Sequence, residues 1–252
     1  MARDFNGSSM RATATAPVTT FPFTASVWFY ADDILFGGAD KYIWSVADTG
    51  TTNNYISIFI SDSTSKIRAT YNAASTIRTN ESGSTVSINQ WNHAVAVYTS
   101  SSDIQIYLNG TAGTNIMAAS ATPTGIDTES IGALVRTTAA AYFDGKIAEV
   151  GVWNVALSQE EISALADAVS PLMVRPASLV KYSPLMGRTD PEIDVMGSYP
   201  FTLVNSPAQS AHPPMRYPGR AQAWKYGAGG SGGGFKAAWA ATRSRVISAG
   251  VN

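Results

Sequence analysis

The chain has 252 residues, 45% of them hydrophobic and 14% charged, so it can bury a sizeable core. It contains no cysteine, which excludes a disulfide-stapled domain and a cysteine-ligated metal site. The net charge of −1 is unevenly spread: residues 1–194 hold all 18 acidic residues, whereas residues 195–252 hold only basic charges.

The basic C-terminal part indicates a segment that binds something acidic. The candidates are another copy of the acidic body, a different protein and nucleic acid. Its charges are spread over about thirty residues, and such a diffuse patch argues against nucleic acid. Residues 1–17 lack the apolar stretch of a signal peptide, and no apolar run is long enough to cross a bilayer. We therefore expect synthesis in a cytoplasm and no membrane partner.

In chain order, short segments of alternating apolar and polar residues, separated by turns, predict the many strands of a β-sandwich. The early strands of this kind span residues 21–31, 42–46, 55–61 and 67–71.

Two later stretches predict the inner strands. Trp91–Tyr98 is apolar on both faces, as expected of a strand covered on both sides. Ile104–Gly110 alternates strictly, and its Asn109-Gly110 end is a strong turn signal because both residues tolerate positive φ. Phe143–Asn154 repeats the doubly apolar pattern of the first stretch.

One helix is expected between Ser158 and Pro171. Ser158 is a good N-cap, Glu161 completes a capping box, and Leu157 can pack onto Ile162. Pro171 ends the helix because the residue before a proline is disfavoured in the α region. Strand-like sequence then returns over residues 178–205, and we expect it to complete the same sandwich.

The order of these motifs resembles the laminin-G-like or concanavalin A-like jelly-roll family, over roughly residues 4 to 170. The resemblance rests on Trp91–Val97, Tyr107–Gly110, Ile131-Gly132, Phe143–Asn154 and Ala156-Leu157-Ser158 before the helix. It implies an all-β jelly-roll sandwich with one short helix over residues 1–212. Lectins, adhesion modules, glycosidases and virion proteins share this fold, so the resemblance leaves function open.

Residues 213–252 differ in composition and are expected to form a C-terminal arm. A glycine-rich hinge spans residues 227–234, and aromatic residues follow it among alanines and bases. We expect an assembly arm that binds a neighbouring subunit, and the alternative is a disordered end. The arm's candidate contact residues are Trp224, Phe235, Trp239, Arg243 and Arg245.

The sequence offers little for catalysis. Glu192-Ile193-Asp194 is similar to the Glu-x-Asp motif of some glycosidases on this fold, but the second Glu is missing, so we expect a solvated turn and no enzyme. His93 and His212 are the two histidines, too few for a metal cluster or a well-supported triad. His93 is expected to be a satisfied or half-buried strand histidine.

The resemblance raises the question of calcium, because many members of the family hold it with loop carboxylates and carbonyls. Loop carboxylates could bind calcium, yet their spacing matches no calcium loop, so we expect no cofactor and assign no ligand. These carboxylates are Asp32, Asp33, Asp40, Asp48 and Asp62. Tyr71 and Tyr142 could stack on a sugar if exposed, although aromatic residues in a sandwich usually belong to the core.

Two functional hypotheses remain. The sandwich, the Arg188–Asp194 segment and the glycine-rich arm resemble structural proteins of tailed bacteriophages. This resemblance implies a non-enzymatic virion component, a capsid decoration or fibre-like protein, anchored by its arm to other virion proteins or to copies of itself. The alternative is a carbohydrate-binding or adhesion module that recognises glycans, host-surface glycans included, through the sandwich loops.

Overall fold

The structure is a computed structural model, and it describes residues 1–34 and 38–217. These residues belong to the first of two units, Met1–Pro218, and the second unit is Gly219–Asn252. Trp224, Phe235, Trp239, Arg243 and Arg245 lie outside the described residues. The assembly arm and its boundary after residue 212 therefore stay predictions.

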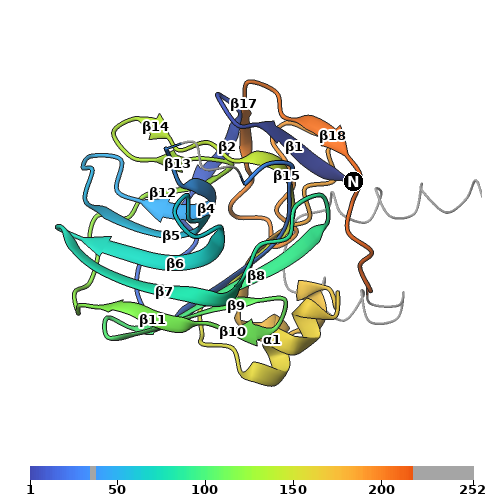
Figure 1. The fold of residues 1–252 in the computed structure, drawn as a ribbon. Coiled ribbons are helices and arrows are strands. Elements are labelled where there is room, and N and C mark those ends of the chain that lie inside the picture. The colour runs from blue at the N-terminus through green and yellow to red at the C-terminus, as the bar shows by residue number, and fades with distance from the viewer. Residues whose placement is uncertain (35–37, 218–252) are drawn as a thin grey trace, which may run out of the picture. The chain divides into compact units, whose positions relative to one another are not determined.

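Two large antiparallel sheets form a sandwich, which confirms the all-β jelly roll (Figure 1). Sheet A has the order β10-β9-β8-β3-β15-β1-β18, with β16 also paired to β15. Its strands are β1 (Ala2–Asn6), β3 (Phe23–Ala31), β8 (Trp91–Ser100), β9 (Asp103–Leu108), β10 (Thr111–Ala112), β15 (Asp144–Trp153), β16 (Leu179–Ser183) and β18 (Ala208–Ser210).

Sheet B has the order β11-β7-β6-β5-β4-β12-β2-β17. Its strands are β2 (Arg11–Thr15), β4 (Lys41–Ala47), β5 (Asn54–Ile60), β6 (Lys66–Ala73), β7 (Thr76–Thr85), β11 (Thr114–Ala118), β12 (Thr128–Ile131) and β17 (Thr202–Val204). A small hairpin of β13 (Leu134–Val135) and β14 (Ala139–Ala140) follows β12. Leu134 of this hairpin packs on Tyr42, Tyr55 and Phe59, so the hairpin covers part of the outer face of sheet B.

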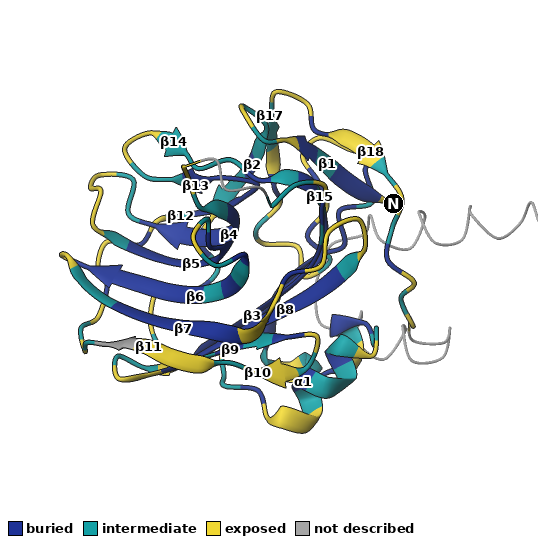
Figure 2. Ribbon diagram, viewed as in Figure 1, coloured by how far each residue is buried: buried dark blue, intermediate teal, exposed yellow. Residues whose placement is uncertain are grey.

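The main core lies between the two sheets, and the long strands β3, β4, β5 and β8 are buried along most of their length (Figure 2). The composition of this core follows from the two-residue repeat of a β-strand, in which every second side chain points to the same face. Ile56, Ile58 and Ile60 of β5 enter this core, and Val27 and Phe29 do so from β3. The side chains between them point to the outer faces, where any binding surface on the strands must lie.

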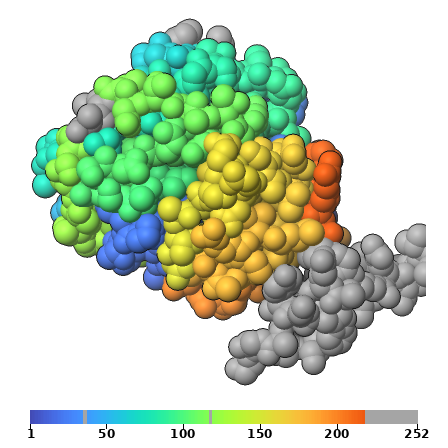
Figure 3. Space-filling view, turned by 90° about the horizontal axis from the view of Figure 1, so that it is seen from below, coloured from blue at the N-terminus to red at the C-terminus, as the bar shows by residue number. Residues whose placement is uncertain are grey.

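The predicted capping box is present, and α1 (Gln159–Ala166) begins after the Ser158 cap. Ile162 and Leu165 of α1 pack on Val95 and Val97, so the helix covers part of the outer face of sheet A. Figure 3 shows residues of this region in yellow beside green residues that come earlier in the chain. The helix stops earlier than Pro171, because the chain turns at Ala168 with φ of 63°.

Two short 3-10 helices, η1 (Pro171–Met173) and η2 (Pro176–Ser178), lead into β16. β16 pairs with β15 and β17 pairs with β2, so the segment after the helix contributes to both sheets. This confirms that residues 178–205 complete the same sandwich. Among the described residues, no helix has the length and apolar character needed to span a membrane.

Candidate functional site

The expectation of a solvated turn at Glu192 and Asp194 is wrong, because both residues are buried. Arg3 Nε lies 2.6 Å from Glu192 Oε1, and the Gly187 amide donates to the same oxygen at 2.9 Å. Asp194 accepts hydrogen bonds from several backbone amides, including those of Tyr182 and Ser198. Both carboxylates are therefore occupied in fixing the chain, which gives them a structural role.

His93 is fully buried on β8. Its Nε2 lies 2.8 Å from Ser26 Oγ, whereas its Nδ1 has no hydrogen-bond partner. Burial lowers the pKa of His93 to about 3, so the ring is neutral at physiological pH. A serine–histidine pair without a carboxylate on the second nitrogen lacks the third member of a triad. His93 lies within a strand, as expected, but it is fully buried and only one of its two ring nitrogens has a partner, so it is neither half-buried nor satisfied.

Sequence patterns did not reveal a buried ion pair between the sheets. Lys181 Nζ contacts Glu129 Oε2, and Trp44 Nε1 donates to Glu129 Oε1 at 2.6 Å. Burial raises the pKa of Glu129 and lowers that of Lys181, while the opposite charge of each partner counteracts both shifts. Each charge therefore depends on the other, which indicates a structural pair.

Glu149 is a second buried acid that the sequence did not single out. Its φ of 56° lies in the left-handed region, at an irregularity between β15 and β3. Tyr182 and Tyr217 donate to its two carboxylate oxygens at 2.8 and 2.9 Å, and His212 Nε2 lies 3.1 Å away. The carboxylate thereby ties residues 212–217 to the sandwich.

The loop carboxylates considered for calcium do not converge. Asp40 accepts the Asp62 amide, Asp48 accepts the Gly50 amide, and Asp32 pairs with Lys146. Within residues 1–34 and 38–217, no group of three or more His, Asp or Glu side chains is placed to hold a metal ion.

Tyr71 and Tyr142 could stack on a sugar only if exposed, and Tyr71 is not accessible to a ligand. It is fully buried, and its hydroxyl donates to the Ser101 and Ala119 carbonyls. Tyr142 is half-buried.

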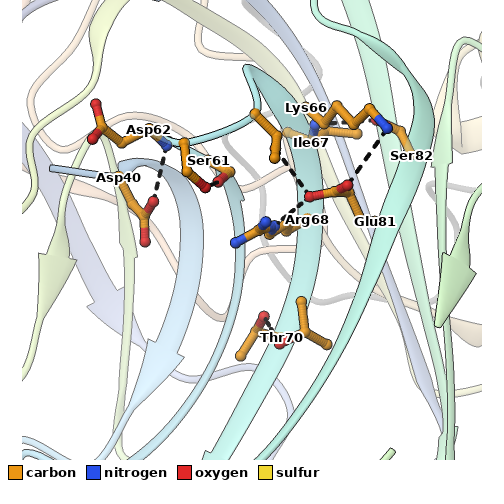
Figure 4. Close-up of polar contacts among 12 residues, drawn as sticks. Asp40, Ser61, Asp62, Lys66, Ile67, Arg68, Thr70, Glu81 and Ser82 are labelled. Carbon is orange, nitrogen blue, oxygen red and sulfur yellow. Dashed lines mark hydrogen bonds and ion pairs between the residues drawn. The ribbon is translucent and has the colours of Figure 1, made fainter. Parts of the chain in front are cut away.

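Partly exposed charges gather on the outer face of sheet B (Figure 4). Arg68 Nε lies 2.7 Å from Glu81 Oε2, Lys66 Nζ lies 3.5 Å from Glu81 Oε1, and the Thr64 hydroxyl donates to Glu81 at 3.0 Å. The side chains of Lys66, Arg68 and Glu81 are 30%, 20% and 10% exposed. We call these four residues the β6–β7 polar cluster.

Glu81 is an anion in this cluster. Burial would raise the pKa of Glu81, but hydrogen bonds from Arg68 and Thr64 and the charges of Arg68 and Lys66 outweigh burial and hold it below its ordinary value. The carboxylate thus stays an acceptor at neutral pH.

Hydroxyl and aromatic side chains lie beside the cluster. Thr70 and Thr79 face each other across β6 and β7, with 2.8 Å between their hydroxyl oxygens. Phe59 lies opposite Arg68, and it stacks on Tyr42 with 4.8 Å between ring centroids. These neighbours are buried, so the accessible polar atoms at this point belong to the cluster.

A family model described as the concanavalin A-like lectin/glucanases superfamily matches residues 5–163. A search of curated proteins found no match. Three solved structures share the fold at identities of 15–20%. The first is a proposed carbohydrate-binding protein from Bacteroides ovatus, with a TM-score of 0.60 and 20% identity over 84% of this chain and 60% of that chain.

The second is domain 4 of the arabinanase AbnA from Geobacillus stearothermophilus with arabinotriose, with a TM-score of 0.53 and 17% identity over 66% of this chain and 76% of that chain. The third is the CBM40 of a Ruminococcus gnavus sialidase with α2,3-sialyllactose, with a TM-score of 0.53 and 15% identity over 66% and 98%. Because the family model covers more than half of the sequence and the sandwich agrees with it, the chain belongs to the concanavalin A-like lectin/glucanase superfamily.

Proposed function

We propose that the protein is a non-catalytic carbohydrate-binding module that holds its glycan at the β6–β7 polar cluster. The observation that carries this proposal is the arrangement of Lys66, Arg68 and Glu81 on the outer face of two paired strands. Sugar hydroxyls both donate and accept hydrogen bonds. Ammonium and guanidinium donors beside a carboxylate acceptor therefore match them.

The strands hold these groups in a fixed geometry. Arg68 and Glu81 are paired directly across the ladder, and Thr64 fixes Glu81 from the β5–β6 turn. A site whose side chains are already positioned loses less entropy on binding. The neighbours that bind arabinotriose and sialyllactose share this fold and support the proposal.

The state of Glu81 supports binding over hydrolysis. The general acid of a glycosidase needs a carboxyl whose pKa is raised, so that it holds a proton to give to the leaving group. The pKa of Glu81 is lowered instead, because its hydrogen bonds and cationic neighbours outweigh burial. Glu81 is thus suited to accept hydrogen bonds from a ligand and unsuited to protonate a glycosidic oxygen.

Calorimetric titration of the full chain with arabinotriose and with α2,3-sialyllactose tests the proposal. The ligand that binds should bind Arg68→Ala at least about ten-fold more weakly, since a hydrogen bond to a charged group contributes about 1.5–3 kcal/mol. Arg175→Ala is the matched control, because it breaks another Arg–Glu pair, with Glu161 at 2.7 Å on the helix. Absence of binding to both sugars, or equal affinity of Arg68→Ala and wild type, would contradict the proposal.

A role as a tailed-bacteriophage virion component is a second proposal, compatible with glycan binding. The observation that favours it is the acid-free, basic sequence of residues 219–252 beyond an acidic body. It predicts that the full chain is oligomeric in light scattering and that a version ending at Pro218 is monomeric. Monomers in both cases would leave self-assembly through this segment without support.

A further inference from the structure

A row of four half-buried side chains crosses the outer face of sheet A. Trp91 of β8 lies opposite Tyr30 of β3, Tyr30 lies opposite Lys146 of β15, and Lys146 lies opposite Asp4 of β1. The residues next to them along three of these strands, Phe29, Ile147 and Phe5, enter the core, so the row points away from it. Three strand spacings give the row a length of about 14 Å.

Contacts within the row hold its members in place. Trp91 and Tyr30 meet edge to face, with 5.9 Å between centroids and 71° between ring planes. Lys146 Nζ lies 4.1 Å from the Tyr30 ring centroid and donates to Asp32 Oδ1 at 2.9 Å. An aromatic pair at one end thus continues into the Lys146 ammonium, which Asp32 and the Tyr30 ring hold in place.

The exposure of Trp91 sets it apart from the other described tryptophans. Trp28, Trp44 and Trp153 are 9%, 1% and 0% exposed, whereas Trp91 is only half-buried. On the same face, α1 packs on Val95 and Val97, and Met215 packs against the Trp28 cluster. The described elements therefore cover the central part of this face and leave the row at its margin partly open.

We infer that this row is a second carbohydrate-binding surface, on the sheet opposite to the β6–β7 polar cluster, for a short β-linked oligosaccharide of pyranose rings. A pyranose with equatorial hydroxyls has apolar C–H faces and hydroxyls around its rim. The partly exposed Trp91 ring matches such a face, and Tyr30, which meets it at 71° and carries Lys146 over its own ring, holds it in place. The Lys146 ammonium and the Asp4 and Asp32 carboxylates match the rim hydroxyls.

Charge supports a neutral ligand over an ionic one. Lys146 is already paired with Asp32, so the row has no unpaired cation for an acidic sugar. Asp4, at the end of the row, adds an acceptor for a hydroxyl. This inference stands whether or not a glycan binds the β6–β7 polar cluster, because the two sets of residues lie on different sheets.

Cellotriose, a β-linked chain of three glucose rings, is the probe. The full chain is titrated with it by calorimetry and by tryptophan fluorescence, beside Trp91→Ala, Asp4→Asn and the control Arg175→Ala, and Arg68→Ala is added to tell the two surfaces apart. We expect wild type to bind with a change in fluorescence, Trp91→Ala to bind at least about ten-fold more weakly, and Asp4→Asn to bind several-fold more weakly. Arg175→Ala, which changes a residue of neither surface, should bind as wild type does.

Three outcomes would overturn the inference. Wild type does not bind cellotriose, or Trp91→Ala and Asp4→Asn both bind it as tightly as wild type, or Arg68→Ala is the one variant that loses binding. The third outcome would place the sugar at the β6–β7 polar cluster and support the proposed function. The thermal midpoint of each variant shows whether it is folded. If Trp91→Ala does not fold, Asp4→Asn, whose side chain is half-buried, tests the inference. Weaker binding of cellotriose by this variant would support the inference, and unchanged binding would contradict it.

Discussion

Arg3 Nε lies 2.6 Å from Glu192 Oε1, although 189 positions of sequence separate the two residues. The same guanidinium donates to the carbonyls of Pro207 and Thr189, both at 2.8 Å. One side chain from the first strand thus fixes the long segment between β16 and β18. The pair is buried, with side-chain exposures of 9% and 3%, so removing one partner leaves the other charge without compensation.

Arg3→Met should lower the free energy of unfolding by about 3–5 kcal/mol, the cost of breaking a buried ion pair from one side. Urea denaturation of wild type and variant measures the difference. Arg175→Met is the control, because its pair with Glu161 is partly exposed and should cost less than about 1 kcal/mol. An equal loss in both variants would show that the Arg3 pair contributes no more than a surface pair.

His93 should make the protein less stable in mild acid. Burial lowers its pKa to about 3 in the folded state, against 6.5 for the ordinary side chain. Between these values the unfolded chain binds the proton and the folded chain does not, so stability falls as the pH falls below 6.5. Between pH 7 and pH 5.5 the loss should be about 1 kcal/mol.

Urea denaturation at several pH values checks this prediction. His93→Asn should show a weaker fall in stability between pH 7 and pH 5.5 than wild type, whatever its stability at neutral pH. His212→Gln changes the other histidine and should retain the fall due to His93. If His93→Asn falls as steeply as wild type, another group causes the acid sensitivity.

The ionised form of Glu81 should stabilise the folded protein, whereas a carboxyl with a raised pKa destabilises the fold when it is ionised. Its pKa is below 4.5 in the folded protein, because hydrogen bonds and cations outweigh burial. Its ionised form therefore stabilises the fold above pH 4.5, and that contribution is lost as the pH falls through the folded pKa. Glu81→Gln should be less stable than wild type at pH 7, with a smaller difference at pH 3.

The stability contributed by Asp144 should depend on pH in the opposite direction to that of Glu81. Burial first, and then the neighbouring charge of Asp32, raises the pKa of Asp144. Its ionised form is disfavoured in the fold, so Asp144→Asn should gain stability relative to wild type at pH 7 and lose that gain in acid. Thermal midpoints measured from pH 7 to pH 3 would show the two opposite trends, and parallel trends would contradict both assignments.

The strands and the helix could be predicted because their signals are local. Asn109 and Gly110 have φ of 50° and 80°, as expected for the turn that their sequence favours. The Ser158 capping box is likewise contained within four residues. Alternation also placed Ile67, Ala69 and Tyr71 on one face, but it does not state which face is buried. This is why Tyr71 could be taken for a surface aromatic.

The candidate sites depend on register and on distant partners, which periodicity does not encode. Arg68 meets Glu81, and Trp91 meets Tyr30, only because two pairs of strands align at these positions. Lys181 and Glu129 also come from different sheets. A charged residue inside an apolar strand pattern was the available signal for Lys181, since such a residue requires a buried partner.

Glu149 should control how firmly residues 212–217 are attached. Tyr217 donates to its carboxylate at 2.9 Å, and the Arg216 amide donates to the Ala168 carbonyl at 2.7 Å. Burial and the charge of Glu149 raise the pKa of Tyr217 above its usual range, so its hydroxyl keeps the proton that it donates. Tyr217→Phe removes a hydrogen bond to a charged group, a loss of about 1.5–3 kcal/mol.

Hydrogen exchange at single amides measures this loss. The Arg216 amide should exchange at least about ten-fold faster in Tyr217→Phe, because local opening of the segment becomes easier. The Asn109 amide, which donates to the His93 carbonyl in another part of sheet A, should exchange at its wild-type rate. Equal acceleration at both amides would indicate a general loss of stability, and no acceleration at Arg216 would show that Glu149 does not fasten this segment.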